Sequence, residues 1–252
     1  MQVETTSMVK VFSRPQSLTD SKSTYCPGCH HGILTRIIGK TLDELDIAGR
    51  AVCIAPVGCA VFAYSWYRSD AVQAAHGRAS AVATGVKRAD PNLIVFAYQG
   101  DGDFASIGTA ESIHAANRGE NITVIFVNNQ VYGMTGGEMA PTSLVDQKTT
   151  TSPTGRDPKQ AGYPIRFSEM IAQLDAPAYV TRQALFDTRR ILDAEKAIKK
   201  AFENQVNGKG YSLVEVLSTC PTNWRMSPVA SNQHIADVVT EVFPLGDLVA
   251  RR

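Results

Sequence analysis

The chain has 252 residues, which is enough for one large α/β domain or two small ones. Its formal net charge of +1 gives no support for nucleic-acid binding, which depends on a large excess of lysine and arginine. No apolar run approaches the ~20 residues needed to cross a bilayer, and the polar N-terminus has no apolar export signal. These features predict a cytoplasmic protein that binds neither nucleic acid nor a membrane.

The first third of the chain predicts an arm followed by alternating helices and strands. Residues 1–24 are polar and are expected to form an N-terminal arm. Apolar residues recur at helical spacing over 31–45 and predict a helix directly after a pair of cysteines. A short apolar run over 51–57 predicts a buried strand, and small residues over 77–87 favour a closely packed helix.

The centre of the chain has the clearest pattern. A continuous apolar strand is predicted over 93–98, a helix over 104–117 and a second apolar strand over 122–127. Strands that are apolar along their whole length and alternate with helices are typical of a parallel sheet covered on both faces.

The later part of the chain continues this alternation after a long loop. Residues 136–163 show little periodicity, which favours a functional loop or a partner surface. The elements predicted beyond it are a helix over 167–174, a strand over 178–181, a helix over 187–207 and a strand over 212–217. We therefore expect one doubly wound α/β domain with a mainly parallel sheet over 25–220. An irregular extension, 221–252, is expected to pack on this domain or on a partner.

Polar residues follow two of the central strands at the points where the strands end. Gly100-Asp101-Gly102 follows one strand, and Asn128-Asn129 follows the next. The carboxyl ends of parallel strands are where open α/β sheets bind ligands, and glycines there allow the backbone to approach a phosphate. Oxygen atoms of Asp101, Asn129 and the Val131 backbone carbonyl are suitable ligands for Mg²⁺.

Each of these motifs alone is most simply a turn. The two motifs together, at this spacing and with a strand, a helix and a strand in this order, are a more specific signal for a ligand site. The stretch 100–137 resembles the diphosphate-binding domain of thiamine diphosphate enzymes. Neither a P-loop lysine motif nor a dinucleotide Gly-x-Gly-x-x-Gly occurs in the sequence, which disfavours nucleoside triphosphates and NAD.

The five cysteines lack the dense spacing of a disulfide scaffold and more often indicate a metal site, catalysis or plain burial than disulfides. Cys26 and Cys29 form a C-x-x-C pair that fits a redox pair, half of a zinc site or part of an iron–sulfur site. Cys59 and Cys220 each follow a predicted strand, so four thiolates could meet near Asp101 and hold one 4Fe–4S cluster. Cys53 lies inside an apolar strand and is expected to be a buried small hydrophobe.

Taken together, these motifs resemble the β subunit of 2-oxoacid:ferredoxin oxidoreductases, in the branch that acts on 2-oxoglutarate or branched-chain 2-oxoacids. The resemblance extends from Tyr25 to Leu245. It is carried by Tyr-Cys-Pro-Gly-Cys (25–29), Ala-Pro-Val-Gly-Cys-Ala-Val-Phe (55–62), Ala-His-Gly-Arg-Ala (75–79), Tyr-Gln-Gly-Asp-Gly-Asp (98–103), Val-Asn-Asn (127–129), Tyr-Gly-Met-Thr-Gly-Gly (132–137) and Ser-Thr-Cys-Pro-Thr-Asn-Trp (218–224).

The resemblance implies a reaction and a set of site residues. A 2-oxoacid, coenzyme A and oxidised ferredoxin would give acyl-CoA, carbon dioxide and reduced ferredoxin, with thiamine diphosphate, Mg²⁺ and a 4Fe–4S cluster as cofactors. The implied cluster ligands are Cys26, Cys29, Cys59 and Cys220. The expected cofactor-binding residues are Cys59, His76, Gly100, Asp101, Gly102, Asp103, Asn129, Val131, Tyr132, Gly133, Met134 and Thr135.

The resemblance also implies partner subunits. An α subunit would carry the pyrimidine-binding domain and the glutamate that activates the cofactor, so no catalytic residue is assigned to this chain. A γ subunit, a ferredoxin-like δ subunit in some complexes and an external ferredoxin are the other expected partners.

The sequence is compatible with alternatives for the function of the chain and for the roles of individual residues. Two competing hypotheses are a non-redox thiamine diphosphate decarboxylase or carboligase subunit and a non-catalytic zinc-binding scaffold. The family usually has glycine where this chain has His30, and glutamine where it has Glu138. His30 fits either an exposed residue at the start of the helix or a hydrogen-bond donor to the cluster. His76 and Arg78 fit either contact with substrate or partner, or internal packing with a salt bridge.

Overall fold

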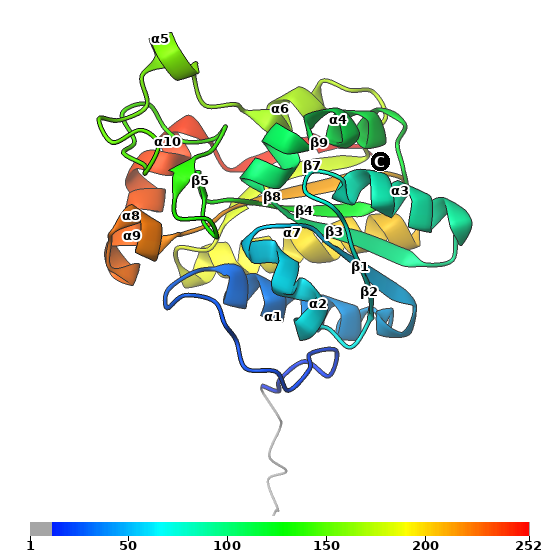
Figure 1. The fold of residues 1–252 in the computed structure, drawn as a ribbon. Helices are drawn as coiled ribbons and strands as arrows, with labels where there is room; N and C mark the ends of the chain where they lie inside the picture. Colours follow the sequence, from blue (N-terminus) through cyan, green and yellow to red (C-terminus); the bar gives the residue numbers. More distant parts are fainter. Residues whose placement is uncertain (1–11, 252) are drawn as a thin grey trace, which may run out of the picture.

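A computed structural model describes residues 12–251 (Figure 1), so part of the predicted arm, residues 1–11, lies outside the described residues. The main sheet has the strand order β2-β1-β3-β4-β8-β7-β9. Its strands are β1 (Ala51–Ala55), β2 (Asp70–Gln73), β3 (Ile94–Gly100), β4 (Thr123–Asn128), β7 (Tyr179–Ala184), β8 (Ser212–Leu217) and β9 (Gly246–Ala250). All neighbouring strands are parallel except β7 and β9. A small antiparallel pair, β5 (Val131–Tyr132) and β6 (Glu138–Met139), lies apart from this sheet.

Helices cover both faces of the sheet, so the expected doubly wound, mainly parallel architecture is confirmed (Figure 1). Helices α1 (His31–Glu44) and α7 (Thr188–Val206) pack on one face, and α3 (Ala79–Ala89), α4 (Thr109–Asn117) and α6 (Phe167–Ala172) pack on the other. The remaining helical segments are α2 (Ala63–Trp66), α5 (Pro158–Ala161), α8 (Pro221–Trp224), α9 (Pro228–His234) and α10 (Thr240–Val242), with 3₁₀ or π turns at Ala48–Arg50, Cys59–Phe62, Asp103–Ile107 and Ile235–Val239.

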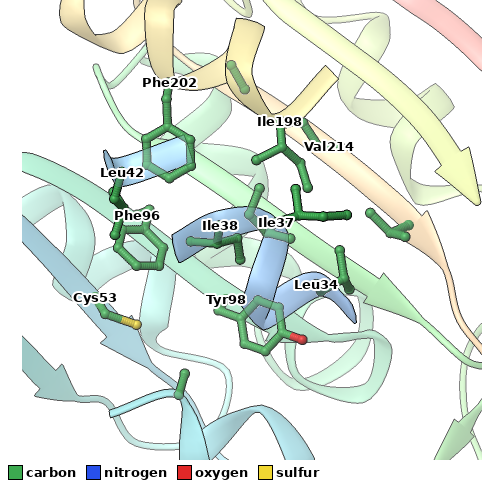
Figure 2. Packing of buried hydrophobic residues seen from close by; sticks show 14 of the residues in the cluster. Leu34, Ile37, Ile38, Leu42, Cys53, Phe96, Tyr98, Ile198, Phe202 and Val214 are labelled. Carbon is green, nitrogen blue, oxygen red and sulfur yellow. The ribbon is translucent and has the colours of Figure 1, made fainter. Parts of the chain in front are cut away.

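The two hydrophobic cores follow from the alternation of side chains along the strands. Phe96 and Tyr98 of β3 point to the α1 and α7 face, whereas Val95 and Ala97 point to the other face. Figure 2 shows Phe96 packed with Phe202 of α7 and with apolar residues of α1. Because both faces are covered, the sequence shows continuous apolar runs rather than alternation.

Two expectations about secondary structure were wrong. The segment from 221 onward is not irregular, because it forms α8, α9, a π turn, α10 and β9. The predicted helix over 104–117 is interrupted, with a π turn at Asp103–Ile107 that precedes α4. The edge strand β2 was not predicted, because all four of its residues are exposed and carry no apolar pattern.

The C-terminal segment packs on the α/β domain. Ile235, Val239 and Phe243 are fully buried against Ala184 and Leu217 at the ends of β7 and β8. Strand β9 then pairs antiparallel with β7 and covers the edge of the sheet there.

The described part of the N-terminal arm lies along α1 and α2. The backbone N–H of Thr19 donates to Trp66 O at 2.9 Å, and the backbone N–H of Arg68 donates to Ser17 O at 2.7 Å. Leu18 packs closely on Gly39 of α1. Among the helices within residues 12–251, none is both long enough and apolar enough to span a membrane.

Candidate functional site

A pocket opens at the carboxyl ends of β1, β3 and β4, where the sequence predicts the diphosphate site. Its lining is His31, Val57, Gly58, Cys59, Ala60, His76, Gly100, Asp101, Gly102, Asp103, Asn129, Val131, Tyr132 and Gly133. Ten of the twelve predicted cofactor residues are therefore brought together here. The other two, Met134 and Thr135, are exposed and do not line the pocket.

Asp101 is the most strongly held side chain of the pocket. One carboxylate oxygen accepts the Gly102 N–H at 2.9 Å, and the other accepts the Gln130 N–H and the Thr142 hydroxyl, each at 2.7 Å. The residue is only 2% exposed, and burial raises the pKa of its carboxyl to about 6, despite the opposing effect of these donors. A buried carboxylate without a counter-charge is a favourable position for a cation.

Asn129 and Val131 lie next to Asp101 and complete the predicted magnesium set. Asn129 is 7% exposed, and its side-chain oxygen accepts the Val131 N–H at 3.3 Å. The Asn129 backbone carbonyl accepts the indole N–H of Trp224 at 3.1 Å, which fixes the strand end. A carboxylate, an amide oxygen and a backbone carbonyl form an oxygen donor set of the kind that suits Mg²⁺.

Asp103 anchors His76, which also lines the pocket. Its carboxylate accepts hydrogen bonds at 2.6 Å from the Gly77 N–H and the Gln99 amide, and it lies 2.6 Å from His76 Nδ1. His76 therefore keeps Nε2 available, and its side chain is 31% exposed. Arg78, in contrast, pairs with Glu111 at 2.9 Å, which is the internal salt bridge of the packing hypothesis.

Glycine is required at position 102 by a close approach. A Cβ atom at this position would overlap the ring of Tyr132, so no larger residue fits unless the ring moves. The Tyr132 hydroxyl reaches Gly102 O at 3.5 Å. The turn that follows β3 is thus packed directly against Tyr132 of β5.

Two of the predicted cluster cysteines flank the pocket. A Cβ atom placed on Gly133 would lie 3.4 Å from Cys59 Sγ and 3.5 Å from Cys220 Sγ, so both sulfurs adjoin the same point of the pocket wall. The C-x-x-C turn is tied to this region by the Thr219 hydroxyl, which donates to Gly28 O at 2.7 Å.

The four predicted cluster cysteines differ in exposure: Cys220 is buried, Cys29 and Cys59 are partly exposed, and Cys26 is exposed. Burial, together with smaller contributions from the neighbouring cysteines, raises the pKa of Cys29 to about 12 and that of Cys59 to about 11. Thiols in such a setting favour the neutral form unless a positive charge is present. Within residues 12–251, no three His, Cys, Asp or Glu side chains are grouped so as to hold a single metal ion. Cys53 is fully buried in β1, as expected for a small hydrophobe.

Two histidines at the start of α1 are buried. His30 is 3% exposed, which excludes the hypothesis of an exposed helix-start residue; its Nε2 lies 2.8 Å from Asn232 Oδ1. His31 lines the pocket, stacks on Tyr25 at 4.7 Å and bonds the Tyr98 hydroxyl through Nδ1 at 2.5 Å. Burial lowers the pKa of both imidazoles to about 4, so both are neutral at pH 7. No sequence pattern pointed to His31.

The long loop over 136–163 contributes site residues that the sequence analysis missed. Besides the Thr142 bond to Asp101, the Ser143 hydroxyl donates to Gln130 O at 2.5 Å. The loop is held together by the guanidinium of Arg156, which is 4% exposed and donates to six backbone carbonyls. The departure at Glu138 places a carboxylate where it accepts the Thr135 hydroxyl at 2.6 Å.

A buried ionic network connects the strands β7, β8 and β4 with the site. Arg182 in β7 bonds Glu215 in β8 at 2.8 Å, and Glu215 accepts the Asn128 amide at 2.7 Å. The Asn128 side chain in turn accepts the Gln130 amide at 2.7 Å. Gln130 has a left-handed backbone, with φ of 60°, and presents its N–H to Asp101. The sequence signal for this network was the presence of two oppositely charged residues, Arg182 and Glu215, inside two apolar strands.

Comparison with known proteins agrees with this arrangement. Residues 56–216 match the family described as thiamine pyrophosphate enzyme, C-terminal TPP binding domain. The chain therefore contains a thiamine-diphosphate-binding α/β domain, in agreement with its fold and with the Asp101 site.

Curated relatives narrow this class. The chain is 52% identical over 239 residues to ketoisovalerate oxidoreductase subunit VorA of Methanothermobacter thermautotrophicus, an alignment that covers 95% of this chain and 50% of that protein. It is 34% identical over 213 residues to 2-oxoglutarate synthase subunit KorB of Archaeoglobus fulgidus, covering 84% of this chain and 75% of KorB. The chain belongs to the family of thiamine-diphosphate-binding subunits of 2-oxoacid:ferredoxin oxidoreductases. It spans about half the length of its VorA relatives.

A solved structure shares the fold. The 2-oxoglutarate:ferredoxin oxidoreductase from Magnetococcus marinus, solved with 2-oxoglutarate, coenzyme A and succinyl-CoA bound, superposes with a TM-score of 0.80 at 24% identity. The match covers 96% of this chain and 86% of the other.

Proposed function

We propose that this chain binds thiamine diphosphate, Mg²⁺ and a 4Fe–4S cluster within a complex that oxidatively decarboxylates a 2-oxoacid to acyl-CoA and carbon dioxide. Electrons would pass through the cluster to ferredoxin, with coenzyme A as co-substrate. The observation that carries the proposal is the convergence of Cys59 Sγ and Cys220 Sγ at Gly133, inside a pocket wall that also contains Asp101 and Asn129.

In this proposal the residues of the pocket have distinct roles. Asp101, Asn129 and the Val131 carbonyl would hold Mg²⁺, whose charge offsets the buried carboxylate. Bound thiamine diphosphate supplies an electron sink for the pair released by decarboxylation. His76, positioned through Nδ1 by Asp103, would present Nε2 to the ligand. Met134 and Thr135 lie outside the lining and would reach the cofactor only through a shift of their exposed segment.

The cysteines would provide the electron path. Cys59 and Cys220 would ligate the iron–sulfur cluster together with Cys26 and Cys29, the usual four-thiolate set. The hydrogen bond from Thr219 to Gly28 O supports this set, because it ties the C-x-x-C turn to the residue before Cys220. Cluster and cofactor would then share one wall of the pocket at Gly133.

A branched-chain 2-oxoacid is the substrate class that we favour. The relative at 52% identity is named as a ketoisovalerate oxidoreductase subunit, whereas the 2-oxoglutarate synthase subunit is 34% identical. A distal carboxylate taken from water requires a paired cation. Among the described residues that line the pocket there is no lysine or arginine.

Partner chains would complete the enzyme. The activating glutamate and the pyrimidine-binding surface are assigned to an α subunit. A γ subunit, and a ferredoxin-like δ subunit in some complexes, would accompany it in the cytoplasm.

Iron content tests the cysteine assignment. Anaerobically purified chain should contain about four irons, and Cys59→Ala or Cys220→Ala should abolish the cluster spectrum. Cys53→Ala is the matched control, since this residue is buried in β1 and should leave the spectrum unchanged. Zinc without iron would support the scaffold hypothesis and contradict the proposal.

The reaction is tested with the chain assembled on its partner subunits. Viologen reduction that depends on coenzyme A should be fastest with 3-methyl-2-oxobutanoate in an anaerobic panel that includes 2-oxoglutarate and pyruvate. A preference for 2-oxoglutarate would overturn the substrate assignment alone. Decarboxylation without viologen reduction would instead favour the non-redox thiamine enzyme.

A further inference from the structure

The side-chain amide of Asn223 connects the cysteine region with the pocket. Its nitrogen, Nδ2, donates to Gly133 O at 2.8 Å and to Cys220 Sγ at 3.2 Å. An amide nitrogen carries two hydrogens, so both N–H groups of Asn223 are used. One bonds the pocket residue Gly133, and the other bonds Cys220. The distances suit an N–H···O and an N–H···S hydrogen bond.

The position of Asn223 is fixed by its surroundings. It belongs to α8, whose first residue, Pro221, is buried directly after Cys220. Gly137, with φ of 85°, faces it so closely that a Cβ there would lie 2.8 Å from Asn223 Cβ. The next residue, Trp224, donates to Asn129 O at 3.1 Å. Helix α8 therefore holds Cys220 beside the segment that contains the predicted magnesium ligands.

We propose that Asn223 is a positioning residue that raises the reduction potential of the iron–sulfur cluster and holds Cys220 in register with the Gly133 segment. This inference rests on the proposed function. A reduced cluster carries one more negative charge than an oxidised one, and part of that charge lies on the cysteine sulfurs. A hydrogen bond to a sulfur therefore stabilises the reduced form and raises the potential.

The test is a potentiometric titration of the full chain with dithionite, followed by electron paramagnetic resonance. Asn223→Ala and the larger Asn223→Leu both remove the donor, and Leu also keeps water out. Both should shift the reduction equilibrium roughly tenfold towards the oxidised form, or about 59 mV to lower potential for a one-electron couple. Thr222→Ala, an exposed neighbour on the same helix, should leave the potential unchanged.

The outcomes separate this inference from the proposed function. An intact cluster with an unshifted potential in the Ala and Leu variants overturns the role of Asn223 alone. A wild-type chain that forms no cluster overturns the proposed function itself. If the Ala and Leu variants do not fold, Asn223→Asp has the same size without the donor and should also lower the potential; an unchanged value there overturns the inference.

Discussion

At the scale of single residues, Asp101 shows how burial prepares a side chain for a cation. Three hydrogen bonds orient its carboxylate, yet burial still makes the charged form unfavourable. A divalent ion would remove this penalty. The Asp101 carboxylate therefore destabilises the folded chain without a metal and is a favourable ligand when a metal is bound.

A pH dependence follows from this cost. The pKa of Asp101 is about 6 in the folded chain and 3.8 ordinarily, so the folded state binds the proton more tightly. The free energy of unfolding of the metal-free chain should therefore fall by about 2 kcal/mol between pH 4 and pH 7 through this residue. Urea unfolding at several pH values should show this loss in the wild type and not in Asp101→Asn. Parallel curves for the two proteins would contradict the assignment.

At the scale of elements, the pairing of β7 with β8 places Arg182 beside Glu215 in the sheet interior. The network extends from there through Asn128 to Gln130, which donates to Asp101. The charged pair thus stabilises the sheet and also shapes the end of β4. Arg182 also donates to the Glu169 carboxylate, at 2.8 Å. The two carboxylates differ in exposure: Glu215 is buried, whereas the Glu169 side chain is 30% exposed.

This difference gives a second prediction. Glu215→Ala leaves a buried guanidinium with one partner, so the free energy of unfolding should fall by about 3–5 kcal/mol. Glu169→Ala should cost clearly less, because water reaches that side of Arg182. Urea unfolding measures both changes. Equal losses in the two variants would show that exposure does not govern the network.

The loop over 136–163 provides a third prediction. Arg156 is its internal anchor, and each hydrogen bond to a charged group contributes about 1.5–3 kcal/mol. Arg156→Met should therefore open the loop, which limited proteolysis would detect as cleavage within 140–163 while the sheet stays intact. Thermal unfolding of the cleaved and uncleaved proteins checks that the sheet stays intact. Resistance equal to that of the wild type would refute the anchoring role.

At the scale of the whole molecule, the C-terminal segment completes the domain. Phe243 is fully buried with Ile235 and Val239, and β9 covers the edge of β7. Phe243→Ala should lower the free energy of unfolding by about 3–5 kcal/mol through loss of buried apolar contact and the cavity that remains. Val229→Ala is the control, since Val229 is 79% exposed. A loss below 1 kcal/mol at Phe243 would show that the segment is dispensable.

The sequence by itself determined the parallel α/β class and the site motifs, because both depend on local signals. Continuous apolar runs identify strands buried on both faces, and residues directly after such strands must gather at one edge of the sheet. This is why Asp101, Asn129 and Cys59 could be placed in one pocket before their positions were known.

The tertiary structure alone decided the supporting contacts, because they join residues far apart in the chain. Thr142 reaches Asp101 from a loop without periodicity, and Asn223 reaches Cys220 and Gly133 from a short helix. The exposed strand β2 and the helical C-terminal segment likewise depend on packing against elements already formed rather than on local pattern. Local sequence preferences do not encode such pairings, since their stabilisation arises only when the chain is folded.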